Sequence, residues 1–248
     1  MGMKFTFNGV SSDSIPFGNS TFDLKIATAP QELAGAFNGE MITYEGRYGQ
    51  RYPSFGVYGN TQRDYNVSFV DEDGNLHKKI RAVRQWLYVK GYKRLEDDYD
   101  PDVYRLATLS GSLDFSLFEN WVAQGGITFN CDPRRFLKTG ETAINCSSNP
   151  YTLNNPYMES NPTILITASG AGTVTIGGTT IEILSAPGAE MAINTEKMTI
   201  MSTASTPVNL SDKVAILNKF PVLGRGNNSI SRTGSVSQVK IIPNWWQP

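Results

Sequence analysis

The chain has 248 residues, of which 40% are hydrophobic and 18% charged, and its formal net charge is −1 at pH 7. This length can form one large β domain or two small ones with a substantial core. The near-zero charge provides no bulk attraction to DNA or anionic lipid. The first residues, "MGMKFTFNGV", lack the apolar segment of a signal peptide, and no apolar run reaches the roughly 20 residues of a membrane helix. Cys131 and Cys146 lack Cys-x-x-Cys spacing, which favours two free thiols in a chain made in a reducing cytoplasm.

Most of the chain is predicted to form short strands. Alternating or β-branched segments recur along it, with Gly, Pro or Asn between them. The expected strands are 65–69, 113–117, 163–167, 173–176, 180–184 and a last strand in 234–246 that stops at Pro243. Tight turns are expected at 71–75 and 176–178, where Gly supplies positive φ.

One segment, 77–90, has a helical pattern instead. Ile80, Val83 and Leu87 recur at helical spacing with Trp86 beside them, and Gly91 is a suitable terminator. We interpret the cations on the remaining arc as a solvated face rather than a binding stripe: Lys78, Lys79, Arg81, Arg84 and Lys90. A single helix among many strands indicates a sheet covered by one helix.

The composition changes near "CDPRRFLKTGE" (131–141), which predicts two domains, 1–132 and 133–248. The first is mixed in charge and aromatics, and the second is a Ser/Thr/Asn/Gly-rich β region with few charges. Within the first, 31–60 is rich in Gly and Tyr but poor in aliphatic residues. Such a segment cannot close a core alone, so it is either a long loop or a hairpin arm that needs a partner surface.

The stretch "RLEDDYDPDVYRLA" (94–107) is the strongest candidate for chemistry, because Glu96, Asp97, Asp98, Asp100 and Asp102 crowd into it. A hydrolytic metal site favours His or Cys beside the acids, but the only histidine, His77, lies in the helix, where we expect it to be exposed. The stretch also lacks the Gly and distal Glu of a calcium loop. We interpret it as a turn that enters a strand after Pro101, with its acids offset by the nearby cations. An all-carboxylate Mg²⁺ or Ca²⁺ site on its four aspartates stays open as an enzymatic alternative.

The glycine-rich stretches give no nucleotide site. The segment 170–178 lacks the Lys-Ser/Thr of a phosphate loop and lies between strands, and 224–228 is interpreted as a turn. The sequence therefore predicts no catalytic residue, no metal ligand and no cofactor.

A series of motifs, in this order, resembles the distal tail protein (Dit) family of siphophages that infect Gram-positive bacteria. The motifs that carry this resemblance are "IRAVRQWL", "GYKRLEDDYDPDVYRLA", "ITFNCDPRRF", "NPTILITASGAGTVTIGGTTIEI", "INTEKM", "FPVLGRGNNSI" and "VKIIPNWW". The motif "GRYG" (46–49) fits the arm region of the family. The resemblance implies a mainly β protein with an N-terminal β domain, one α-helix and a protruding arm, followed by a galectin-like β-sandwich.

The resemblance also implies a structural role in the virion. Proteins of this family form a hexameric ring at the tail tip, or baseplate, that joins the tail tube to the hub and can carry receptor-binding proteins, while DNA crosses the lumen. The Tyr/Arg composition of the arm suits an interface between copies, and its candidate residues are Tyr44, Arg47, Tyr48, Arg51, Tyr52, Phe55 and Tyr58.

The alternative function is carbohydrate binding through 133–248. A sugar face needs exposed aromatic side chains, and the candidates are Tyr151, Tyr157 and one of Trp245 and Trp246. Adjacent strand residues face opposite sides, so we expect one of the two tryptophans to lie in the core.

Overall fold

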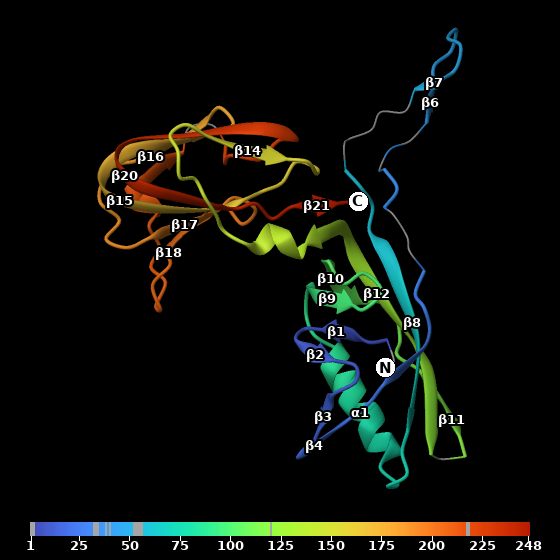
Figure 1. Ribbon diagram of the computed structural model, residues 1–248. Coiled ribbons are helices and arrows are strands. Elements are labelled where there is room, and N and C mark those ends of the chain that lie inside the picture. The colour runs from blue at the N-terminus through green and yellow to red at the C-terminus, as the bar shows by residue number, and fades with distance from the viewer. Residues whose placement is uncertain are drawn as a thin grey trace. The chain divides into compact units, whose positions relative to one another are not determined.

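The computed structural model describes residues 3–31, 35–37, 39, 41–51, 57–119, 121–216 and 219–248. The chain divides into two compact units, one of Met1–Arg135 with Pro248 and one of Phe136–Gln247. The described residues form many strands and a single α-helix (Figure 1), so the predicted mainly β class is confirmed. In this part of the chain, no helix is long and apolar enough to span a membrane.

The first unit is built on one curved sheet with the strand path β2-β1-β9-β10-β12-β8-β5, and β11 pairs with β12. Two separate hairpins, β3–β4 and β6–β7, complete its strands. The bounds are β1 (Phe5–Phe7), β2 (Val10–Ser11), β3 (Ile15–Phe17), β4 (Ser20–Phe22), β5 (Lys25–Thr28), β6 (Ile42–Thr43), β7 (Gln50–Arg51), β8 (Thr61–Val70), β9 (Lys93–Asp97), β10 (Val103–Leu109), β11 (Phe115–Phe118) and β12 (Val122–Leu137).

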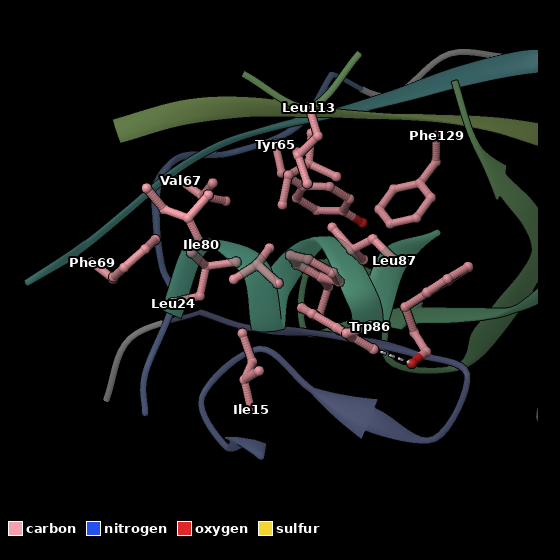
Figure 2. Packing of buried hydrophobic residues seen from close by; sticks show 14 of the residues in the cluster. Ile15, Leu24, Tyr65, Val67, Phe69, Ile80, Trp86, Leu87, Leu113 and Phe129 are labelled. Carbon is pink, nitrogen blue, oxygen red and sulfur yellow. Dashed lines mark hydrogen bonds between the residues drawn. The ribbon is translucent and has the colours of Figure 1, made fainter. Parts of the chain in front are cut away.

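The core of this unit lies between the sheet and helix α1 (Leu76–Leu87), as Figure 2 shows. Strand β8 alternates strictly, so that Tyr65, Val67 and Phe69 are buried while the residues between them face outward. The indole N–H of Trp86 donates to the carbonyl oxygen of Phe7 at 2.9 Å. The predicted apolar face of the helix is thereby confirmed.

Two details of the helix prediction are wrong. The helix ends at Leu87 instead of Lys90, and the backbone N–H of Tyr88 donates to the carbonyl oxygen of Arg84 at its C-terminus. Lys79, expected on the solvated face, is buried because it pairs with the buried carboxylate of Asp71 at 2.5 Å.

The second unit is organised by two long antiparallel strands, β15 and β20, which pair along most of their length. Its elements are η1 (Lys138–Glu141), β13 (Ile144–Asn145), β14 (Tyr151–Asn155), β15 (Thr163–Ile176), β16 (Thr179–Ile183), β17 (Met191–Asn194), β18 (Thr199–Ser202), η2 (Ser211–Lys213), β19 (Val214–Ile216), β20 (Gly226–Ile242) and β21 (Trp246–Gln247).

Strand β15 changes partner along its length. Residues 163–166 pair with β17, and residues 172–176 pair with β16. Between them the β15–β20 register shifts at Thr167–Gly172, opposite Gly234 with φ +66°. A bulge of this kind bends both strands, and the residues on either side of it pack into one aliphatic core.

Three strand predictions need correction. Segments 163–167 and 173–176 are one bent strand, because the glycines between them form a bulge rather than a hairpin turn. The predicted turn at 224–228 is already strand from Gly226, where β20 pairs with β14. Strand β11 starts at Phe115, two residues after the predicted Leu113, which packs in the core. The stop before Pro243 and the turn at 176–178 are confirmed.

Candidate assembly surface

The predicted arm segment contains the hairpin β6–β7. Ile42 faces Arg51 and Thr43 faces Gln50, whose side-chain amide donates to the Thr43 hydroxyl at 3.0 Å. Gly46 and Gly49 adopt positive φ (+75° and +78°), as the tight connection between the strands requires. Every residue from 41 to 51 is exposed. The hairpin therefore has no hydrophobic core of its own.

The structure places the expected interface residues in two groups. Tyr44, Arg47, Tyr48 and Arg51 lie together on the exposed hairpin, and Tyr48 is fully exposed. Tyr58 lies apart from them at the base of the arm. Tyr52 and Phe55 lie outside the described residues.

Sequence reasoning missed three apolar members of the arm surface. Phe37, Met41 and Ile42 are all exposed. These residues could have been identified from the sequence, because they are among the few apolar residues of the arm segment. The interface prediction considered mainly Tyr and Arg and therefore left them out.

The base of the arm is joined by backbone pairing. The N–H of Gly59 donates to the carbonyl oxygen of Ala36 at 2.8 Å, and Phe37 bridges to Tyr58 with their ring centroids 4.5 Å apart. A Cβ added at Gly35 would lie 2.8 Å from the carbonyl oxygen of Gly59, so the close approach requires glycine. The two segments at the base of the arm are thus held next to each other.

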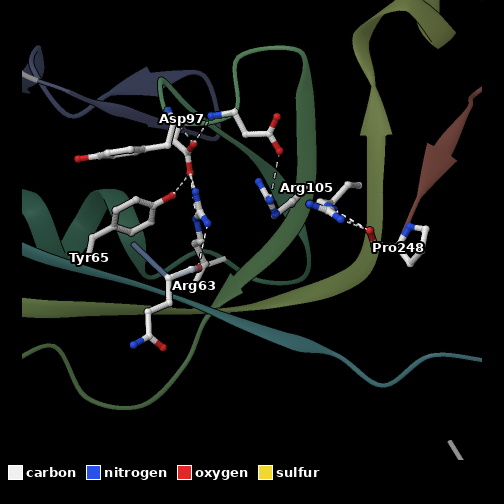
Figure 3. Close-up of polar contacts among 9 residues, drawn as sticks. Arg63, Tyr65, Asp97, Arg105 and Pro248 are labelled. Carbon is white, nitrogen blue, oxygen red and sulfur yellow. Dashed lines mark hydrogen bonds and ion pairs between the residues drawn. The ribbon is translucent and has the colours of Figure 1, made fainter. Parts of the chain in front are cut away.

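A buried polar network lies beside this base (Figure 3). Arg63 donates from Nε and Nη2 to one oxygen of Asp97 at 3.0 and 2.7 Å, and the Tyr65 hydroxyl donates to the same oxygen at 2.6 Å. Nη1 of Arg63 donates to the carbonyl oxygen of Gln31 at 3.0 Å. Since Gln31 begins the predicted arm segment and Arg63 follows it, the network ties the start of the arm to the sheet.

Burial and the Asp97 charge set the ionisation of this network. Burial by itself lowers the pKa of the Arg63 guanidinium, but attraction to Asp97 and bonds to Asp97 and Tyr65 outweigh burial and raise it. Burial raises the pKa of the Tyr65 phenol, and the neighbouring Asp97 carboxylate raises it further. The network therefore holds one cation, one anion and a neutral phenol as a hydrogen-bonded unit.

The acid-rich stretch has a structural role. The remaining oxygen of Asp97 accepts from the backbone N–H groups of Tyr99 and Asp100, each at 3.1 Å, which shapes the turn between β9 and β10. Asp100 pairs with Arg105 at 3.5 Å. The predicted turn and the strand from Val103 are confirmed.

The expected partners of these acids were wrong in part. The ion pairs of Glu96 and Asp97 are made by sheet residues, Arg94 and Arg63, and not by cations of the helix, because the strands bring those arginines closer. Among the described residues, no group of three or more His, Cys, Asp or Glu side chains could hold a metal ion.

The histidine and the two cysteines were the remaining candidates for catalytic residues. His77 is exposed on α1, as predicted. Both cysteines are free and buried, and burial raises the pKa of Cys131 to about 12 and that of Cys146 to about 11. Neither thiol is poised to act as a nucleophile near neutral pH.

The aromatic residues considered for a sugar face are packed rather than presented as a platform. Tyr151 and Trp245 are partly buried against the core of the second unit. The Tyr157 ring lies 5.6 Å from that of Trp245, and the indole N–H of Trp246 donates to the carbonyl oxygen of Glu159 at 2.7 Å. The expectation that one terminal tryptophan lies in the core is met only in part, because Trp245 packs against the core but both Trp245 and Trp246 are half-buried.

A second exposed apolar surface lies on the first unit, where β8, β11 and β12 meet. Val70 and Phe118 oppose the same β12 residue from either side, so they share one face of the sheet. Both are about half exposed, as is Trp121 in the adjoining turn, whose indole N–H donates to Glu119 at 3.3 Å. Glu72 is exposed in the turn after β8. This β8–β11–β12 surface is therefore apolar with acidic residues at its margin.

Comparison with known proteins adds the decisive observation. Residues 19–131 match the family described as phage tail protein RIFT-related domain, which covers the arm, the helix and most of the first sheet. This part of the chain is therefore similar to a phage tail protein domain. The crystal structure of the SPP1 Dit protein, described as a paradigm of the hub adsorption apparatus in phages infecting Gram-positive bacteria, has the same fold.

The fold likeness to SPP1 Dit extends over both units. The TM-score is 0.72 at 10% sequence identity, and the match covers 97% of this chain and 98% of that one. The resemblance to distal tail proteins is thus confirmed. A search of curated proteins finds no match to the sequence.

Proposed function

We propose that this protein is a non-enzymatic distal tail protein, which forms a hexameric ring at the phage tail tip. The ring links the tail tube to the baseplate and adhesion device, and DNA passes through its central channel. The observation that carries the proposal is the exposed hairpin of residues 41–51, in a chain that is similar to a phage tail domain over residues 19–131 and has the fold of SPP1 Dit.

The arm is the proposed contact between copies. Exposed Tyr, Met and Ile side chains on a hairpin without a core gain free energy when a neighbouring copy covers them. A closed ring satisfies every such contact without growing into a filament. We assign Tyr44, Arg47, Tyr48, Arg51, Tyr52, Phe55 and Tyr58 to this interface.

The β8–β11–β12 surface is the proposed receiving site on the neighbouring copy. The hairpin carries Arg47 and Arg51, while the receiving surface has Glu72 and Glu119 at its margin. Opposite charges around an apolar contact fix its register and disfavour other pairings.

The other partners follow from the proposed place in the virion. The ring contacts the major tail tube protein, the tail-associated hub or lysin protein and a receptor-binding protein, and two rings can stack. The second unit is proposed to be a galectin-like sandwich at the periphery. A chain with net charge −1 suits a conduit that releases DNA, and assembly takes place in the host cytoplasm.

Size-exclusion chromatography with light scattering, followed by negative-stain microscopy, tests the ring. We expect the mass of six copies and ring particles with a central hole, and a strict monomer at high concentration would contradict the proposal. The triple variant Y44A/R47A/Y48A should shift the equilibrium toward monomer by at least about tenfold, because such residues dominate interface energies.

The matched control changes exposed apolar residues of the second unit, M198A/V208A, and should leave the ring intact. Both variants should keep the wild-type circular dichroism, since all of their residues are exposed. Equal assembly of the arm variant and the control would show that the arm is not the interface.

A further inference from the structure

A polar pocket in the second unit lies outside the proposed ring contacts. It has a volume of about 360 Å³, within the range of small-molecule sites. Its lining comes from two segments, one at the end of β13 and just after it, and one on β20: Asn145, Cys146, Ser147, Arg232, Ser237 and Gln238.

The fold holds these two segments together. The backbone N–H of Cys146 donates to the carbonyl oxygen of Val239 at 3.0 Å. The side-chain amide of Asn149 donates to the carbonyl oxygen of Arg232 at 2.8 Å and accepts from its N–H at 3.0 Å. The segment after β13 is therefore fastened to β20 at both ends of the pocket.

The bulge in β20 explains how residues distant on one strand line one pocket. A straight strand would separate Arg232 from Gln238 by about 20 Å, at roughly 3.3 Å per residue. The register shift and the left-handed conformation of Gly234 bend β20 between them. Bulges commonly redirect side chains at binding sites in this way.

The charge in this pocket is not neutralised within the described part of the chain. Arg232 is half-buried, and Nη1 donates to the carbonyl oxygen of Cys146 at 2.8 Å, which fixes the guanidinium. No carboxylate there forms an ion pair with it. The other lining side chains are neutral hydroxyl and amide groups, apart from the Cys146 thiol. Arg232 acts on that thiol by lowering its pKa, although burial has the larger effect and raises it.

We propose that this pocket binds an oxyanion, a phosphate or carboxylate group, with Arg232 as its charged donor. A fixed guanidinium presents paired N–H groups that match two oxygens of such a group. The hydroxyl of Ser147 and one N–H of the Gln238 amide supply further donors around it. The other Gln238 N–H donates to Oδ1 of Asn145 at 3.4 Å, and the Ser237 hydroxyl donates to the carbonyl oxygen of Thr167 at 3.1 Å. Phosphate binding at this site does not require ring formation, so the experiment tests this proposal independently of the proposed function.

Equilibrium dialysis of the full-length protein with radiolabelled inorganic phosphate, at constant ionic strength, measures the binding. We expect saturable binding that R232A weakens by at least about tenfold, the usual effect of losing a charged hydrogen-bond donor. R232K retains the positive charge and should bind with intermediate affinity. Because R232A can also loosen the segment after β13, R232K provides a second variant that tests the role of the charge.

The matched control is R225A, which removes an exposed arginine from the same unit and should bind phosphate like the wild type. Thermal unfolding verifies that each variant is folded. Equal affinity of R232A and wild type, an equal loss in R225A, or no saturable binding below about 10 mM phosphate would overturn the proposal.

Competition identifies the source of the anion. Stronger binding of glucose 6-phosphate than of phosphate, with no competition by glucose, would indicate a phosphate carried on a sugar. Equal binding of the two phosphates would indicate that the phosphate group alone is recognised.

Discussion

Replacing Asp97 by Asn removes the negative charge at the centre of the buried network and should destabilise the first unit severely. The side chains of Asp97 and Arg63 are 1% and 4% exposed, so water cannot replace the lost partner. The carboxylate accepts from Arg63, from the Tyr65 hydroxyl at 2.6 Å, and from two backbone N–H groups. Removing one partner of a buried pair costs about 3–5 kcal/mol. We expect D97N to lose free energy of unfolding in that range.

Hydrogen exchange measured by mass spectrometry tests this loss in the full chain. Peptides from β8 and β9 report on the first unit alone, and their exchange rates convert to a free energy of opening. The matched control is D102N, which changes an exposed acid of the same turn and should stay within about 0.5 kcal/mol of wild type. A D97N loss below about 1 kcal/mol would refute the reasoning, because the pair would then be effectively solvated.

The double variant R63M/D97L separates the loss of a partner from the loss of the pair. With both charges replaced by apolar side chains of similar volume, about half of the stability lost in D97N should return. It should remain below wild type by about 1–3 kcal/mol, because the Tyr65 hydroxyl would be buried without an acceptor. Measuring R63M and D97L singly by the same exchange experiment completes the double-mutant cycle that gives the coupling energy of the pair.

Three further predictions concern other parts of the chain. Burial raises the pKa of Asp71, but the bond to Lys79 and the backbone bonds near the start of α1 outweigh burial and lower it from 3.8. The stabilisation by Asp71 is therefore lost as the pH falls below about 4 and through the folded pKa, and D71N should lose less stability than wild type over that range in urea titrations. G234A should lose about 1–3 kcal/mol more than G188A, because both have positive φ but only at Gly234 would a Cβ lie 2.6 Å from a carbonyl oxygen. Thermal unfolding distinguishes them, and equal losses would contradict the clash. Ellman's reagent should modify Cys131 and Cys146 slowly in native protein and both rapidly in denaturant, whereas one fast native thiol would contradict their burial.

The local patterns that the sequence predicted well are those whose period is set by one buried face. The spacing of Ile80, Val83 and Leu87 predicted the helix, because apolar residues on one face are the condition for packing on a sheet. The stop of β20 before Pro243 followed from the missing N–H donor of proline. The same logic failed for 163–176, since glycines mark hairpin turns and bulges alike, and only the pairing with β20 distinguishes them.

The sequence by itself determined the mainly β class, the single helix and the exposed character of the arm, because each depends on composition or periodicity within a short segment. It also placed the acid-rich stretch in a turn. Only the tertiary structure decided that Arg63 is the partner of Asp97 and that Arg232 and Gln238 line one pocket. Ion pairs and pockets form between residues that strand register and bulges bring together, and those long-range pairings leave no periodic signal along the chain.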